Sequence, residues 1–192
     1  MTSGLILAAG SGSRFTRGPK QLAEFGGRPL LDWALEAQCA VTELERIILV
    51  LGARADEILA AVKLGRAEAV ICNDWATGQS ASLKTGMRAL ADSETVIVTL
   101  GDQPLITAGT IRRFFGEPAG TRAVYQGKPG HPVVLGREQL PAIEALAGDA
   151  GARALLTRGR EIECIALSPL GGLDIDTVDD LDACLSLIQP PM

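Results

Sequence analysis

The stretch "LILAAGSGSRFTRGPKQLAEF", residues 5–25, sets the pattern from which the fold of this chain is predicted. An apolar run ends at a loop of glycine and serine that carries three cations, Arg14, Arg17 and Lys20. The chain has a formal net charge of −5, yet no acidic residue interrupts the stretch before Glu24. A basic glycine loop after a buried strand of an acidic protein favours a small anionic ligand over a nucleic-acid surface.

Short apolar runs alternate with segments of helical periodicity along the rest of the chain. This alternation predicts βαβ units, and hence an α/β fold with a mainly parallel sheet covered on both faces. Two strand-like runs flank "GKPG" with no helix between them, which predicts a small antiparallel excursion. We expect strands at residues 4–9, 46–51, 68–72, 95–100, 121–126, 131–135 and 161–167, and helices at 29–40, 55–63, 80–91, 108–115, 137–147, 150–158 and 178–188.

The composition is that of a soluble globular protein, with 47% apolar and 21% charged residues. We expect a single domain over residues 1–192, located in the cytoplasm, because no apolar stretch approaches the length of a membrane span and no basic segment precedes the first one. The four cysteines are scattered and there is one histidine, so a zinc cage is not expected.

The glycine loop has the chemistry of a phosphate site. Gly10 and Gly12 permit a tight turn whose N–H groups form a nest for phosphate oxygens, and Lys20 adds a mobile positive charge. The loop is not a Walker A motif, because Gln21 follows the lysine. It also breaks the dinucleotide fingerprint, because Phe15 stands where the third glycine belongs. An ordinary glycine-rich turn with exposed cations remains the alternative; the cations and the preceding strand favour phosphate.

Carboxylates follow at two distant places in the chain. In "TVIVTLGDQPLI", Asp102 comes just after a buried strand, where a carboxylate that faces a triphosphate would bind Mg²⁺; the alternative is a turn or helix-cap aspartate. Asp174 and Asp176 share one face of an extended segment. Thr177 and Asp180 have the spacing of a helix N-cap, and Asp179 and Asp180 are interpreted as structural. Asp176 is therefore the better metal candidate of the terminal acidic run.

These motifs resemble a known family. "LAAGSGSR…PK", "GDQP" and "DIDTVDDL" are similar to the MobA-like nucleotidyltransferases, and "NDWATGQSASLKTGM", "GKPGHPVVL" and "GDAGARALL" resemble the molybdenum cofactor cytidylyltransferases among them. The resemblance spans residues 5 to 182 in motif order. It implies a Rossmann-like three-layer nucleotidyltransferase fold. It also implies Mg²⁺-dependent transfer of CMP from CTP to the phosphate of molybdopterin cofactor, with release of pyrophosphate.

The resemblance also implies roles for individual residues. Arg14, Lys20 and Asp102 are the expected catalytic residues, and Asp102 and Asp176 the expected Mg²⁺ ligands. His131 is expected near the acceptor; a general base is not required, because a phosphate nucleophile is already anionic. The loop between Arg14 and Lys20 is one residue longer than the usual form, which leaves the contact of Lys20 open. The expected nucleotide-binding residues are Leu7, Ala8, Ala9, Gly10, Gly12, Arg14, Lys20, Asn73, Ser82 and Asp102.

Several alternatives remain at this point. The acceptor could be another phosphorylated compound, and the base could be other than cytosine. An NAD(P)-dependent oxidoreductase on the same scaffold is disfavoured by the missing third glycine and by "LGAR" (51–54), which offers no acid for a ribose after the second strand. A non-catalytic role in handing the cofactor to a molybdoenzyme is compatible with transfer. Neither nucleic acid nor a membrane is an expected partner.

Overall fold

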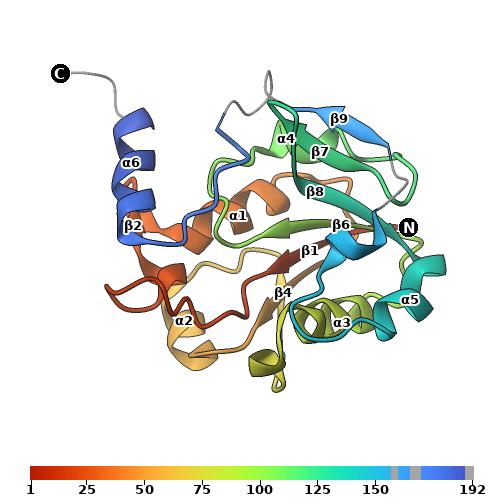
Figure 1. Ribbon diagram of the computed structural model, residues 1–192, viewed down its shortest axis with the longest axis horizontal. Coiled ribbons are helices and arrows are strands. Elements are labelled where there is room, and N and C mark those ends of the chain that lie inside the picture. The colour runs from red at the N-terminus through yellow and green to blue at the C-terminus, as the bar shows by residue number, and fades with distance from the viewer. Residues whose placement is uncertain (157–159, 165–169, 189–192) are drawn as a thin grey trace.

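A computed structural model describes residues 1–156, 160–164 and 170–188 of the chain. Figure 1 shows a central sheet with helices packed around it. The strands are β1 (Thr2–Leu7), β2 (Glu24–Phe25), β3 (Arg28–Pro29), β4 (Ile47–Leu51), β5 (Glu68–Ile71), β6 (Thr95–Leu100), β7 (Arg122–Tyr125), β8 (Lys128–Gly136) and β9 (Glu161–Glu163). The helices are α1 (Leu30–Cys39), α2 (Ala55–Ala61), α3 (Gln79–Ala89), α4 (Ala108–Arg112), α5 (Leu140–Glu144) and α6 (Val178–Ile188).

The main sheet has seven strands in the order β5-β4-β1-β6-β8-β7-β9. Strands β5, β4, β1 and β6 are parallel, whereas β8 pairs antiparallel with both β6 and β7. The change of direction follows from a tight turn, because Gln126 and Gly127 both have positive φ (52° and 74°), as in hairpin turns that match the twist of the strands. The predicted parallel sheet with a small antiparallel part is confirmed.

The central strands are apolar on both faces because helices cover both sides. Leu5, Ile48 and Val98 pack with residues of α3 and α5. Their chain neighbours, such as Ile6 and Leu49, pack with residues of α1, α2 and α4 on the opposite face. Side chains alternate between the faces with a period of two, so a strand enclosed by two helical layers must be apolar throughout. The expected three-layer arrangement is confirmed.

Two predicted helices are shorter than expected. Residues 137–147 form a 3₁₀ turn followed by the single short helix α5, and Pro141 lies in the first turn of that helix. In the described part of the second predicted helix, residues 150–156, the only helical element is a 3₁₀ turn, Ala152–Leu155, which follows Gly148 with its positive φ of 58°. Proline and left-handed glycine both interrupt helical hydrogen bonding, so the periodicity overestimated these helices. Residues 157–158 and 165–167 of the predicted elements lie outside the described residues.

The C-terminal helix returns to the N-terminal loop. It packs on the β2–β3 hairpin through a third apolar cluster, and Figure 1 shows α6 beside β2. Thr177 caps the helix, because its Oγ1 accepts a hydrogen bond of 3.1 Å from the Asp180 main-chain N–H. Asp180 Oδ2 in turn accepts from the Thr177 N–H at 2.8 Å, which confirms the predicted cap. The cap and the cluster place residues 174–176 beside a loop that lies more than a hundred positions earlier in the sequence.

Among the described residues, no helix combines the length and the apolar character that a bilayer crossing requires.

Candidate active site

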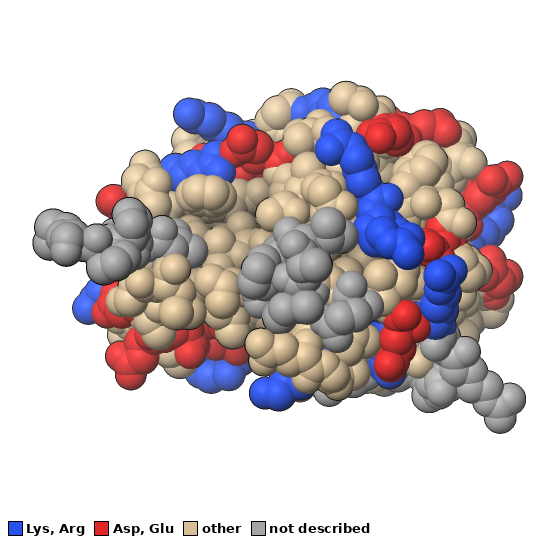
Figure 2. All heavy atoms as spheres, turned by 90° about the horizontal axis from the view of Figure 1, so that it is seen from above, with Lys and Arg blue, Asp and Glu red and all other residues tan. Residues whose placement is uncertain are grey.

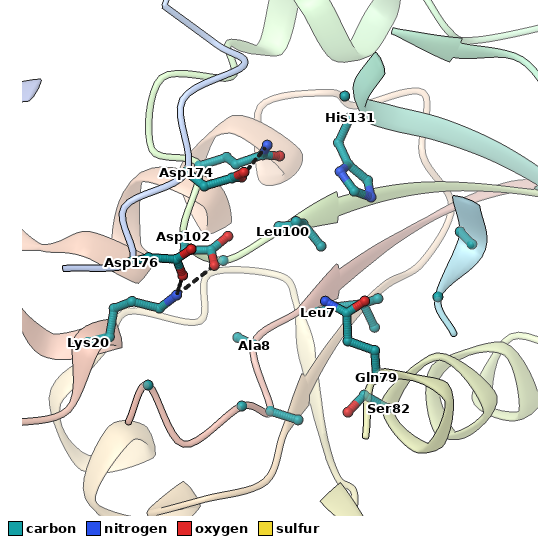
Figure 3. Close-up of a pocket in the computed structure, with 18 of the residues that line it drawn as sticks. Leu7, Ala8, Lys20, Gln79, Ser82, Leu100, Asp102, His131, Asp174 and Asp176 are labelled. Atoms are coloured by element: carbon teal, nitrogen blue, oxygen red, sulfur yellow. Dashed lines mark hydrogen bonds and ion pairs between the residues drawn. The ribbon is translucent and has the colours of Figure 1, made fainter. Parts of the chain in front are cut away.

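One cavity of about 810 Å³ opens at the carboxyl ends of β1 and β6. This is the edge at which open parallel sheets gather their ligands. The lining residues come from the glycine loop, the loop after β6, helix α3, strand β8 and the segment before α6 (Figure 3). Eleven of the twelve residues predicted for the site line it: Leu7, Ala8, Ala9, Gly10, Gly12, Arg14, Lys20, Ser82, Asp102, His131 and Asp176. Their individual roles stay predictions.

Asn73 is not brought into this cavity. It is exposed and follows β5, the edge strand, which β4 separates from the cavity-bearing β1. The position of a residue after a parallel strand places it at the correct edge of the sheet, but not at the correct strand. The proposed contact of Asn73 with a nucleoside stays a prediction.

The glycine loop presents main-chain donors that have no partner among the described residues. In the described part of the chain, none of the N–H groups from Ala9 to Ser13 donates a hydrogen bond. Gly12 has a φ of 62°, and a Cβ atom there would lie 3.0 Å from Lys20 Cβ, so a side chain at this position would be strained. A run of unpaired N–H groups beside a cavity is suited to binding an anion.

Lys20 connects the loop with the two carboxylates that follow distant elements. Its Nζ lies 2.7 Å from Asp102 Oδ2 and 3.0 Å from Asp176 Oδ1. Dashed lines mark both contacts in Figure 3. Arg14 Nη2 lies 2.8 Å from Asp176 Oδ2. The Lys20 side chain is 11% exposed. Burial by itself would lower the pKa of Lys20, but the charges and hydrogen bonds of Asp102 and Asp176 together raise it above its ordinary value. Lys20 is therefore an ammonium that contacts both carboxylates, and its contact with a triphosphate stays a prediction.

Asp174 lies in a different environment from Asp176. Its Oδ1 accepts a hydrogen bond of 2.7 Å from Gln103 Nε2 (Figure 3). Burial raises the pKa of Asp174, and the nearby charge of Asp102 raises it further. Asp176, rather than Asp174, shares the Lys20 ammonium with Asp102.

The carboxylates fit a divalent cation only together with a ligand. No group of three or more histidine, cysteine, aspartate or glutamate side chains with a metal-binding arrangement occurs among the described residues. Asp102 Oδ1, however, is buried and has no hydrogen-bond partner in the described part of the molecule. Mg²⁺ is commonly held by one or two carboxylates plus phosphate oxygens and water. Asp102 and Asp176 can supply the protein share of such a site.

Sequence reasoning missed several residues that line the cavity. Gln21, Gln79, Arg122 and Asp149 are among them. Gln21 was read only as the residue that excludes a Walker A motif. Nothing local marks Arg122, because its position on the cavity face depends on the pairing of β7 with β8.

Residues 4–162 match the MobA-like NTP transferase domain. A relative over nearly the whole chain is "Nicotine blue oxidoreductase" of Paenarthrobacter nicotinovorans, which is 32% identical over 194 residues, or 93% of this chain and 94% of the relative.

Solved structures share the fold. Rv0371c of Mycobacterium tuberculosis is 29% identical with a TM-score of 0.81, over 96% of this chain and 97% of that one. A complex of that protein with manganese is 28% identical with a TM-score of 0.78, over 97% and 99% of the two chains. Molybdopterin-guanine dinucleotide biosynthesis protein A of Archaeoglobus fulgidus is 17% identical with a TM-score of 0.67, over 97% and 98%, and shows the similarity of fold alone.

Proposed function

The chain belongs to the MobA-like NTP transferase family, a family of nucleotidyltransferases, and from this premise we propose that it transfers CMP from CTP to the phosphate of molybdopterin cofactor, with release of pyrophosphate. The choice of CTP and of the acceptor is supported by the motifs "NDWATGQSASLKTGM", "GKPGHPVVL" and "GDAGARALL". One protein with the same fold is named for the biosynthesis of molybdopterin-guanine dinucleotide, and this name is compatible with a pterin acceptor.

A single observation carries the proposal: two carboxylates and a glycine loop whose N–H groups find no acceptor among the described residues line one cavity. Lys20 joins the two sides, because it belongs to the loop and its Nζ contacts Asp102 and Asp176. The volume of about 810 Å³ lies in the upper part of the usual range for ligand sites and leaves room for a second substrate beside a nucleotide.

In the proposed reaction, an acceptor phosphate oxygen forms a bond to the α-phosphorus of CTP. The bond from that phosphorus to the bridging oxygen breaks, and pyrophosphate leaves with the electron pair. The loop N–H groups and Arg14 would bind the triphosphate, and Lys20 would balance the charge on the leaving group. His131 would contact the acceptor, and no residue has to remove a proton.

Asp102 and Asp176 would hold a divalent metal, which we propose to be Mg²⁺. A bound divalent cation neutralises phosphate charge and aligns the reacting oxygens. The manganese complex of a related structure supports the use of a divalent ion by this fold.

The test is direct. The purified protein is incubated with MgCl₂, α-labelled CTP or GTP, and either molybdopterin cofactor or a panel of sugar and alcohol phosphates. We expect labelled product and pyrophosphate only with CTP and the pterin. Transfer to a different acceptor would replace the pterin proposal while leaving the nucleotidyltransferase assignment intact.

A second candidate, an oxidoreductase, is favoured by the relative named "Nicotine blue oxidoreductase". Two features of the chain oppose a dinucleotide in the glycine loop. Phe15, at the position of the third fingerprint glycine, is 5% exposed and packs in the third apolar cluster, which includes residues of α6. Gly52, Ala53 and Arg54 follow β4, so the turn after this strand offers no acidic side chain to a ribose. Binding of NADH or NADPH, followed by nicotinamide fluorescence, together with oxidation of the reduced form by a dye, would favour this candidate.

We further propose that the product passes to a molybdoenzyme and that nucleic acid is not a partner. Figure 2 shows basic and acidic side chains next to one another at several places on one face. Several exposed arginines of the described chain pair with glutamates: Arg88 with Glu144, Arg112 with Glu43, and Arg160 with Glu117. Such pairing supports the absence of an extended basic surface. A pull-down with a molybdoenzyme that lacks its cofactor tests delivery.

A further inference from the structure

Gln21 is buried beneath the glycine loop and uses its whole amide donor capacity there. Its Nε2 donates to Ala8 O at 3.0 Å and to Gly10 O at 3.0 Å. The residue is 5% exposed. An amide NH₂ group has two hydrogens, so these two bonds saturate it. One side chain therefore holds two alternate carbonyls of the loop.

The planarity of the peptide bond extends this contact to the opposite side of the loop. In a trans peptide, the C=O of one residue and the N–H of the next point in opposite directions. When Gln21 holds the carbonyls of Ala8 and Gly10, it turns the N–H groups of Ala9 and Ser11 away from itself. The Ala9–Gly10 peptide, which lies between the two peptides held by Gln21, is also fixed, because Ala9 O accepts a hydrogen bond of 3.1 Å from the Ala53 N–H.

The N–H groups of Ala9 and Ser11, which are oriented in this way, have no acceptor among the described residues. Ala9, Gly10 and Ser11 line the cavity, and none of their N–H groups donates within the described part of the chain. Ala9 is 3% exposed, so an N–H group there without an acceptor is costly and indicates a ligand that supplies one. Gly10 and Ser11 are exposed, so their N–H groups are accessible to the same ligand. A linear polyphosphate has closely spaced anionic oxygens that match such a row of donors.

We propose that Gln21 is a positioning residue: it orients the N–H groups of Ala9 and Ser11 toward the cavity and so sets the affinity of the loop for a linear polyphosphate. Gln21 acts through the main chain and need not touch the nucleotide. The inference rests on the proposed triphosphate-binding role of the loop, and it depends neither on the base nor on the acceptor.

The test substitutes Gln21→Met, which keeps the length of the side chain and removes both donors. Gln38→Met is a matched control. Gln38 is fully buried and its Nε2 also donates to main-chain carbonyls, Leu5 O at 3.4 Å and Ile97 O at 3.3 Å, but it does not line the cavity. The probe is inorganic tripolyphosphate, with affinity measured by calorimetry, and the urea midpoint of each variant is measured in parallel.

We expect Gln21→Met to weaken tripolyphosphate binding by about tenfold to a hundredfold, since two charge-assisted hydrogen bonds lose their orientation. We expect Gln38→Met to lower the urea midpoint about as much as Gln21→Met does, while it binds tripolyphosphate as the wild type does. The KM for CTP should rise in the Gln21 variant and stay unchanged in the Gln38 variant. Should Gln21→Met not fold, Gln21→Asn retains the amide but is one methylene too short to reach both carbonyls, and it should show the same loss.

Wild-type affinity in the Gln21 variants, or an equal loss in Gln38→Met, would overturn the inference. Failure of the wild type to bind tripolyphosphate would overturn both the inference and the loop assignment on which it rests. If the wild type binds tripolyphosphate but transfers no CMP, the proposed reaction alone fails and the role of Gln21 stands.

Discussion

Replacing Lys20 with methionine removes the cation that bridges Asp102 and Asp176. Methionine fills a similar volume with an unbranched, uncharged side chain. In the structure, the Lys20 ammonium occupies the space between the two carboxylates that are proposed to hold a divalent ion. The substitution therefore leaves two neighbouring negative charges with less compensation, and a divalent cation becomes the natural replacement.

The size of the effect follows from the burial of the three groups. The Lys20 side chain is 11% exposed, and those of Asp102 and Asp176 are 24% and 28% exposed. Breaking a fully buried ion pair costs about 3–5 kcal/mol. Because water reaches about a quarter of each carboxylate, we expect the free energy of unfolding to fall by about 2–3 kcal/mol. For a chain of this size, each kcal/mol corresponds to about 2–4 °C, so the Tm should fall by roughly 4–12 °C.

The assay is thermal unfolding with and without millimolar MgCl₂ or MnCl₂. We expect either salt to raise the Tm of Lys20→Met markedly and that of the wild type only slightly, because a metal can replace the missing ammonium. Arg88→Met is the matched control: it removes an exposed ion pair with Glu144, so its stability should change little and should not depend on the metal. Equal metal effects on the wild type and Lys20→Met would refute the idea that Lys20 occupies the place of the cation.

Three further changes test other parts of the site. Asp102→Asn should lower CMP transfer by about a thousandfold with the fold retained, because several kcal/mol of charge stabilisation are lost; initial rates measure it. Gly52→Ala should cost about 1–3 kcal/mol and weaken CTP binding, since a Cβ there lies 2.6 Å from Ala9 O; urea unfolding and calorimetry measure the two effects. Hydrogen bonds from Thr177 lower the pKa of Asp180, so its contribution to stability is present above the unfolded pKa of about 3.9 and is lost as the pH falls. Asp180→Asn should therefore lower the Tm near neutral pH, and this deficit should shrink as the pH falls through the folded-state pKa, which lies below the unfolded value.

Each of these has a contrary outcome. Near-normal turnover of Asp102→Asn would remove that residue from the reaction. If Gly52→Ala binds CTP as the wild type does, the loop after β4 does not support the glycine loop. A deficit of Asp180→Asn that stays the same as the pH is lowered past the unfolded pKa would show that the capping geometry, and not the charge, stabilises α6.

The sequence by itself predicted the elements whose signal is local. The apolar runs of β1, β4 and β6 are confirmed as central strands, because a strand that is covered by helices on both faces is apolar at nearly every position. The Thr177–Asp180 cap is also confirmed, since its signal is local: the two partners are three residues apart. The periodicity failed after β8, where Pro141 and the glycines that follow decide the helix ends. The single domain stays a prediction.

Contacts between residues that are far apart in the chain could not be predicted from the sequence. Whether Lys20 reaches Asp102, 82 positions away, and Asp176, 156 positions away, depends on how β1, β6 and α6 pack. The exclusion of Asn73 from the cavity depends on the order of the strands. The role inferred for Gln21 depends on which main-chain oxygens its amide meets. Residue chemistry and local spacing can be determined from the sequence alone. Contacts between side chains of distant segments are determined only by the tertiary structure, because apolar burial selects one packing of the layers.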